Sequence, residues 1–137
     1  MRYMLDTNIC IYLLNEQPPH VFERFMRLDV GDVVMSCITL AELRHGASTW
    51  PKEGRHDNQA ALDALLDDIP ALPFGEAAAR SSGLLASLSK LKPDKAIDNL
   101  IAAHAISLGA VLVTNNERDF RGYASLAVEN WVLKSIS

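Results

Sequence analysis

Four of the 17 acidic residues are candidates for a shared site, because each lies close to an apolar run: Asp6, Glu42, Asp98 and Asp119. Carboxylate oxygens are the ligands that hard divalent cations such as Mg²⁺ prefer. Acids delivered from separate elements to the carboxyl edge of an α/β sheet would build a site for such a cation. The pattern therefore predicts metal-assisted chemistry on a phosphodiester.

Asp6 directly follows the apolar residues 3–5, at an expected turn from a strand into a helix. Asp is among the best N-cap residues, so Asp6 could simply cap that helix. Thr7 or Asn8 can also supply the cap, and ligand sites form at the carboxyl ends of strands in α/β sheets. We therefore expect Asp6 to belong to the site.

Glu42 permits two interpretations that do not exclude each other. Residues 39–42 read Thr-Leu-Ala-Glu and fit a capping box, in which Glu42 would reach back to the Thr39 amide. Glu42 and His45 also form one Glu-x-x-His unit, but a di-iron bundle requires two such units and the chain has no second one. Glu42 remains a candidate ligand.

Asp98 shares an expected helix face with Ile101, Ala102 and Ala105. An unpaired buried carboxylate is costly, so a metal or an arginine is expected beside it. His104 lies roughly on the opposite flank of this helix and is interpreted as a packed histidine.

Asn115 and Asn116 end the most strongly apolar strand candidate, and Asp119 follows three residues later. The two asparagines could form only an Asx turn, which is the default for such a pair. A small basic cluster precedes Asp98 and consists of Lys90, Lys92 and Lys95. Such a cluster is usually a solvated helix end, but it could also hold a phosphate backbone.

The elements that would position these residues alternate between strands and helices. Apolar runs predict strands at 3–5, 33–37, 71–74 (an edge strand), 110–114 and 126–131. Helical spacing predicts helices after residue 6, at 21–26, 39–45 (stopped by Gly46), 61–69, 76–91 and 93–108, with a loop at 50–57. This order predicts an α/β fold with three layers, a central mostly parallel sheet flanked by helices.

The 137 residues suit a single domain spanning 1–137, with 49% hydrophobic and 22% charged residues. No apolar run approaches the ~20 residues of a membrane span, and no signal peptide is evident, so a cytoplasmic protein is expected. Cys10 and Cys37 lie in apolar stretches and are expected to be buried free thiols. The net charge of -4 argues against broad nonspecific binding to nucleic acid, although a local basic patch remains compatible with it.

Five blocks of the sequence together resemble a PIN-domain ribonuclease of the VapC toxin type. They are Leu5-Asp6-Thr7-Asn8, Ile38–Leu43 with Gly46-Ala47, Asp98–Ala105, Leu112–Asn116 with Asp119-Phe120, and Val128–Trp131. They extend over nearly the whole chain in the family's order. The segment 91–95 departs from the glycine-containing turn of many relatives.

The resemblance implies a single PIN-like nuclease domain with Asp6, Glu42 and Asp98 as metal ligands for Mg²⁺ or Mn²⁺. Asn116 stands at the fourth family position, which is often Asp, and Asp119 could substitute for that acid. The implied activity is endonucleolytic cleavage of structured RNA of the tRNA or rRNA class. The implied partners are a VapB-type antitoxin and a second copy of the chain in a homodimer.

Other classes fit the residues less well. A receiver domain needs a paired acid beside the first-strand Asp, an acceptor Asp after a mid-chain strand and a late Lys, and none is found. A haloacid-dehalogenase phosphatase needs a second Asp where Asn8 stands. A catalytically weak or inactive PIN-type RNA-binding module remains the alternative, and Asp6, Glu42 and Asp98 argue against it.

Overall fold

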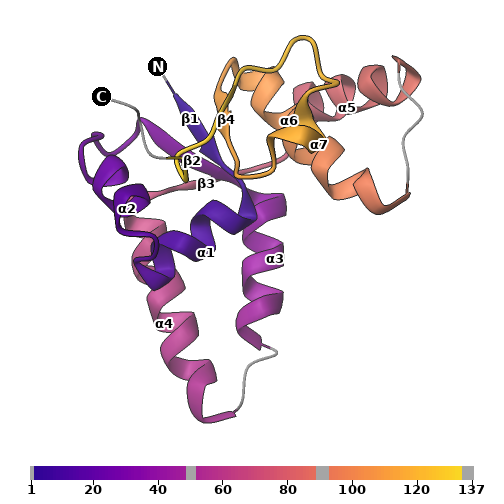
Figure 1. Cartoon of the computed structure of the whole chain (residues 1–137). Coiled ribbons are helices and arrows are strands. Elements are labelled where there is room, and N and C mark those ends of the chain that lie inside the picture. Colours follow the sequence, from indigo (N-terminus) through magenta and orange to yellow (C-terminus); the bar gives the residue numbers. More distant parts are fainter. Residues whose placement is uncertain (1, 49–51, 89–92, 134–137) are drawn as a thin grey trace.

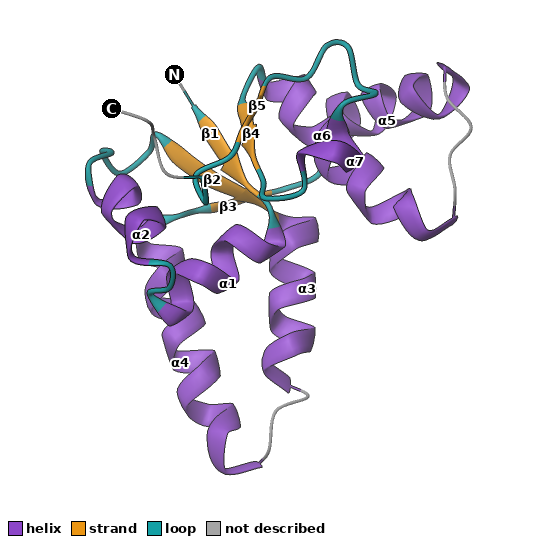
Figure 2. Ribbon diagram, viewed as in Figure 1, coloured by secondary structure: helices purple, strands orange, loops and turns teal. Residues whose placement is uncertain are grey.

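The computed structural model describes residues 2–48, 52–88 and 93–133, and its centre is a five-stranded sheet. The strands are β1 (Tyr3–Leu5), β2 (Val33–Ser36), β3 (Ala71–Leu72), β4 (Val111–Val113) and β5 (Val128–Glu129), in the order β3-β2-β1-β4-β5. Every pairing is parallel. The predicted three-layer α/β fold is confirmed, and the expected edge strand β3 lies at the sheet's edge (Figure 2).

Helices cover both faces of this sheet. They are α1 (Thr7–Asn15), α2 (Pro19–Met26), α3 (Cys37–Ser48), α4 (Lys52–Asp68), α5 (Glu76–Leu88), α6 (Ala96–Leu108) and α7 (Glu117–Phe120), with a 3₁₀ turn η1 at Pro93–Lys95. Helices α1 to α4 lie on one side of the sheet, and α5, α6 and α7 lie on the other (Figure 1). Connections of this kind between parallel strands bring strand ends and helix starts to one edge.

Each face of the sheet has its own hydrophobic core, because successive strand residues point to opposite sides. In β1, Leu5 packs with Ile9 of α1 on one face. Its neighbour Met4 packs on the other face with Ile101 of α6 and Leu112 of β4. All five of these side chains are fully or almost fully buried. Strand β1 is therefore anchored from both sides, which fixes the position of Asp6 at its end.

Several predicted element boundaries were wrong; the strand expected at 126–131, for example, is limited to Val128–Glu129. Helix α3 continues through Gly46 to Ser48, because the packing of Leu43 and Ala47 outweighs the roughly 1 kcal/mol cost of one helical glycine. The predicted loop at 50–57 is helical from Lys52 onward. Once a helix is held by buried side chains such as Leu62, the residues before it can extend the helix even though Gly54 within them is a poor helix former.

The two cysteines are free thiols. Cys10 is buried as predicted, and burial raises the pKa of its thiol strongly. Cys37, at the start of α3, is only half-buried. No helix within the described ranges is both long and apolar enough to cross a membrane.

Candidate active site

Asp6 is held by three hydrogen bonds where β1 passes into α1. Its backbone amide donates to the Val113 carbonyl at 3.0 Å, and its carboxylate accepts from the Ile9 amide at 3.0 Å. The Thr114 hydroxyl bonds to the same carboxylate. Asp6 is therefore the N-cap of α1, so the expectation that Thr7 or Asn8 serves as the cap was wrong. An N-cap residue has an extended backbone, as Asp6 does, whereas Thr7 is already the first residue of the helix.

The Asp6 carboxylate is kept away from solvent, with only 8% of the residue exposed. This burial raises its pKa, and the bonds from Thr114 and the Ile9 amide lower it in part. The negative charges of Asp98 and Glu42 raise it further. Capping does not satisfy this group fully, and a nearby cation would stabilise its ionised form.

Glu42 is directed to the site by Thr7 and not by a capping box. The Thr7 hydroxyl donates to Glu42 Oε1 at 2.5 Å, which connects α1 to α3. The capping-box interpretation of Thr39 and Glu42 was wrong because α3 begins at Cys37, which places Thr39 inside the first turn. The first turn is closed instead by the Ser36 hydroxyl, which accepts from the Ile38 amide at 3.0 Å.

Asp98 lies in the first turn of α6 and is half-buried. Burial raises its pKa, the Lys95 ammonium lowers it, and the charges of Asp119 and Glu42 raise it again. The sequence led us to expect a metal or an arginine beside this carboxylate. The cation that the structure records there is the ammonium of Lys95.

Asn116 and Asp119 are connected at the start of α7. The Asn116 side-chain amide donates to Asp119 Oδ2, and the Nζ atom of Lys95 lies 2.6 Å from the same oxygen. The turn before α7 is closed by the Thr114 hydroxyl, which accepts from the Asn116 amide at 3.0 Å. A threonine side chain therefore closes this turn, where an Asx turn of the two asparagines was the default expectation.

The separate acids converge on one cavity of about 160 Å³. Its lining consists of Asp6, Thr7, Asn8, Glu42, Asp98, Ile101, Asn116 and Phe120. Asp119 is not among the lining residues and reaches the cavity through its bond to Asn116. Figure 2 shows that α1 and α3 begin at the carboxyl edge of the sheet, and the cavity is lined by residues from the starts of α1 and α6 and from α3.

Among the residues that the structure describes, no three His, Cys, Asp or Glu side chains are already placed to ligate one ion together. The shared cavity and the mutual effects of Asp6, Glu42 and Asp98 on pKa nevertheless put these acids in one electrostatic environment. Mg²⁺ binds through one or two carboxylates and keeps several waters, so it does not require three side chains already placed around one point. An all-oxygen set around an open cavity fits such an ion.

Several contacts of the site had no clear signal in the sequence. Lys95 was noticed only as part of a basic cluster, and its ion pair with Asp119 joins residues far apart in the chain. Tyr123 was missed: its pKa is raised mainly by partial burial and next by the charge of Asp98. His104 is a packed histidine as predicted, and its Nδ1 lies 2.8 Å from the Ser36 hydroxyl.

Replacing Thr114 with Val is expected to destabilise the protein by about 1–3 kcal/mol, because it leaves polar groups at Asp6 and Asn116 without their partner. Thr39→Val is a matched control, since the Thr39 hydroxyl is equally buried but has no hydrogen-bond partner within the described structure. That control should be neutral or stabilising. Urea unfolding of both variants checks this, and equal losses would show that the Thr114 hydroxyl has no special role.

Comparison with known proteins agrees with this geometry. The family model described as "PIN domain" matches residues 3–126. The tRNA(fMet)-specific endonuclease VapC of Shigella flexneri is 38% identical over 133 residues, covering 96% of this chain and 98% of that protein. Ribonuclease VapC2 of Rickettsia felis is 37% identical over 137 residues, with the same coverage.

Solved structures show the same fold. The crystal structure of VapBC2 from Rickettsia felis bound to a DNA fragment from their promoter has a chain that superimposes with a TM-score of 0.83 at 34% identity, covering 96% of this chain and 99% of that one. A chain of VapBC-1 from nontypeable Haemophilus influenzae gives the same score and identity, covering 97% of this chain and 100% of that chain. This chain therefore belongs to the PIN-domain family and, within it, to the VapC ribonucleases.

Proposed function

We propose that the chain is a metal-dependent endoribonuclease, formed by one domain over residues 1–137, that acts as the toxin of a toxin–antitoxin pair. The observation that carries this proposal is the cavity at the carboxyl edge of the sheet, to which β1, α3 and α6 deliver Asp6, Glu42 and Asp98. Membership of the VapC ribonucleases supports the same conclusion.

Asp6, Glu42 and Asp98 would hold Mg²⁺ or Mn²⁺, with Asn116 and Asp119 completing the site. The donors are all oxygens, as hard cations require, and burial together with like charge disfavours the ionised forms of Asp6 and Asp98 until a cation is present. A bound divalent ion supplies activation of water as the nucleophile and neutralisation of charge at the scissile phosphate.

The chain's own residues orient this donor set. The Ile9 amide and the Thr114 hydroxyl fix the Asp6 carboxylate, and the Thr7 hydroxyl fixes Glu42. Asn8 and Asn116 are exposed and line the cavity, so they can donate hydrogen bonds to phosphate oxygens without adding negative charge. No nucleophilic side chain is required for hydrolysis by water.

The substrate class is structured RNA, with transfer RNA the first candidate and ribosomal RNA the second. The Shigella flexneri relative, a tRNA(fMet)-specific endonuclease, supports this order. An inactive RNA-binding module is the competing function. Protein that binds RNA but leaves it intact with Mg²⁺ and with Mn²⁺ would favour the module.

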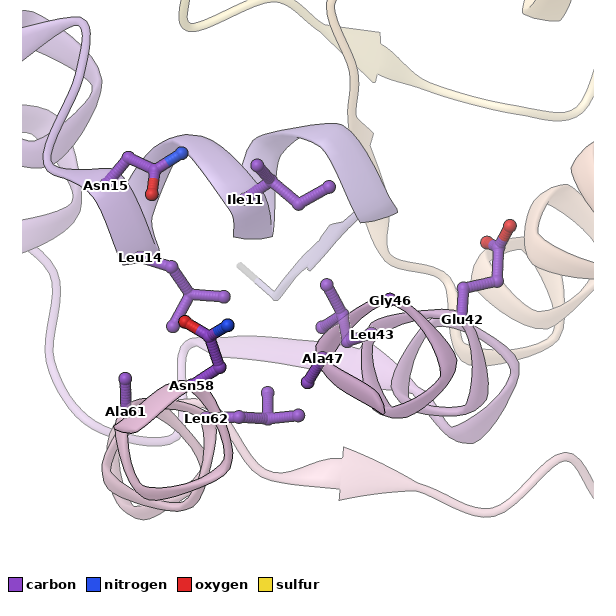
Figure 3. Close-up of a pocket in the computed structure, with 10 residues that line it drawn as sticks. All are labelled: Ile11, Leu14, Asn15, Glu42, Leu43, Gly46, Ala47, Asn58, Ala61 and Leu62. Carbon is purple, nitrogen blue, oxygen red and sulfur yellow. The ribbon is translucent and has the colours of Figure 1, made fainter. Parts of the chain in front are cut away.

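An antitoxin of the VapB type is the proposed protein partner, because the similar solved chains come from VapBC complexes. A second cavity of about 160 Å³ suits a segment of that partner. Figure 3 shows this cavity between α1, α3 and α4, with Leu14, Leu43 and Leu62 on its walls and Glu42 beside it. Because Glu42 lines both cavities, an apolar segment bound here could extend an arginine to the acids. We also propose a homodimer.

Cleavage by chelator-treated protein is expected to return with Mg²⁺ or Mn²⁺ and not with Zn²⁺, because an oxygen-only donor set favours hard ions. The same ions should raise the melting temperature by mass action, with an increase that grows with ion concentration. Ca²⁺, which binds oxygen ligands with looser geometry, is the control for binding without the right coordination. Cleavage that persists in excess chelator would contradict the metal mechanism.

A further inference from the structure

Lys95 forms an ion pair with Asp119, which is itself bonded to the cavity-lining residue Asn116. Lys95 ends the 3₁₀ turn before α6, and its Nζ atom lies 2.6 Å from Asp119 Oδ2 on α7. The two side chains are 34% and 20% exposed, so the pair is partly shielded from solvent. The pair therefore joins the element that carries Asp98 to the element that carries Asp119.

The bonds of Asp119 limit what this carboxylate can do in the metal-free protein. Its Oδ2 atom receives both the Lys95 ammonium and the Asn116 side-chain amide. A carboxylate oxygen accepts about two such bonds, so this atom is occupied. For Oδ2 to bind a cation, at least one of these two contacts must break.

The charge of Lys95 also acts on Asp98. It favours the ionised form of Asp98, whereas Glu42 and Asp119 disfavour that form. The other ion pairs within the described ranges, Arg24 with Glu129, Arg44 with Asp63 and Arg80 with Glu76, involve none of the proposed metal ligands. Arg118 contributes to the electrostatics of Asp119, but more weakly than Lys95.

We propose that Lys95 is the internal counter-ion of this site: its ammonium holds Asp119 in the metal-free protein and competes with the divalent cation for the acidic cluster. This inference rests on the proposed function. An ammonium cannot coordinate the other acids as a metal does, so it lowers the repulsion among them without replacing the ion. Lys95 is thus a positioning residue that sets the metal concentration at which the site fills.

Replacing Lys95 with Gln tests this directly, with Mn²⁺ affinity measured by calorimetry at fixed pH and low salt. Loss of the ammonium that occupies Asp119 Oδ2 should tighten Mn²⁺ binding roughly five- to tenfold, because the cation no longer has to displace it. Lys95→Arg keeps the charge and should stay within about twofold of the wild type. Arg118→Gln is the matched control, because it removes a positive charge from the same region without breaking the bond to Asp119, and it should change the affinity less.

A second comparison separates this role from simple support of the fold. In an Asp119→Asn background, Lys95→Gln should change Mn²⁺ affinity by less than about twofold, because the Lys95–Asp119 ion pair that the cation would have to displace is already absent. If the single variant Lys95→Gln binds Mn²⁺ no more tightly than the wild type, the inference is overturned. A lower melting temperature of this variant without tighter Mn²⁺ binding would mean that Lys95 only supports the fold. If the wild type itself binds no Mn²⁺, the proposed function and this inference both fail. If the wild type binds and Lys95→Gln does not differ from it, only the inference fails.

Discussion

Replacing Asp98 with Asn is expected to lower the rate of RNA cleavage by roughly a hundredfold or more while leaving the protein folded. The amide has the shape of the carboxylate but lacks the charge that holds a divalent cation. Asp94→Asn is a matched control, because Asp94 is exposed, lies four residues away and does not line the cavity. Cleavage of labelled RNA at saturating Mg²⁺ measures both variants.

The same substitution should change how stability depends on pH in the absence of metal. Burial raises the pKa of both Asp98 and Asp6 above the ordinary value of 3.8, so folding favours their protonated forms. Their contribution to stability is therefore fully present below pH 3.8 and is lost as the pH rises through the raised pKa values. Asp98→Asn should lose less stability as the pH rises over this range, as measured by urea unfolding in the presence of chelator.

A variant that unfolds while its folded fraction still cleaves RNA would make Asp98 a structural residue.

Replacing Ala61 with Trp is expected to abolish binding of the antitoxin while preserving cleavage. Ala61 is exposed and lines the apolar cavity between α1, α3 and α4, so an indole there would occupy the space needed by a partner segment (Figure 3). Ala60→Trp is a matched control, because Ala60 is also exposed on α4 but does not line the cavity. The measurement is copurification with a coexpressed VapB-type antitoxin that binds the wild-type chain, followed by cleavage assays of each preparation.

Undiminished copurification of the Ala61→Trp variant would place the antitoxin on a different surface. Loss of cleavage by the free variant would show that the substitution disturbs the active site through Glu42, which lines both cavities. The expected result is that the Ala61→Trp variant loses antitoxin binding and keeps cleavage in the same preparation.

The sheet and its helices could be predicted because their buried residues follow simple periods. Strand β4 is a continuous apolar run that is buried on both faces, and such a run is typical of a central parallel strand. The same reasoning placed Asp6 at a strand end and Asp98 on an apolar helix face. Parallel strand ends meet at one edge, so acids far apart in the chain could be expected to converge.

The errors came from features that depend on tertiary contacts. Thr39 and Glu42 match a capping box in sequence, but Ser36 closes the first turn and moves the helix start ahead of Thr39. The bond from Thr7 to Glu42 and the ion pair of Lys95 with Asp119 cross between elements that only the fold brings together. Local pattern cannot specify such pairs, because many side chains compete for each charged group.

Mapping the ends of RNA fragments made by the purified protein tests the central claim most directly. The protein is incubated with total cellular RNA and Mg²⁺, alongside a chelator control and the Asp98→Asn variant prepared in the same way. Hydrolysis by a metal-activated water predicts discrete cuts that leave a phosphate monoester and no 2′,3′-cyclic phosphate, and that vanish in both controls. Cuts that persist in chelator and in the variant, or that leave 2′,3′-cyclic phosphates from attack by the ribose hydroxyl, would contradict the account.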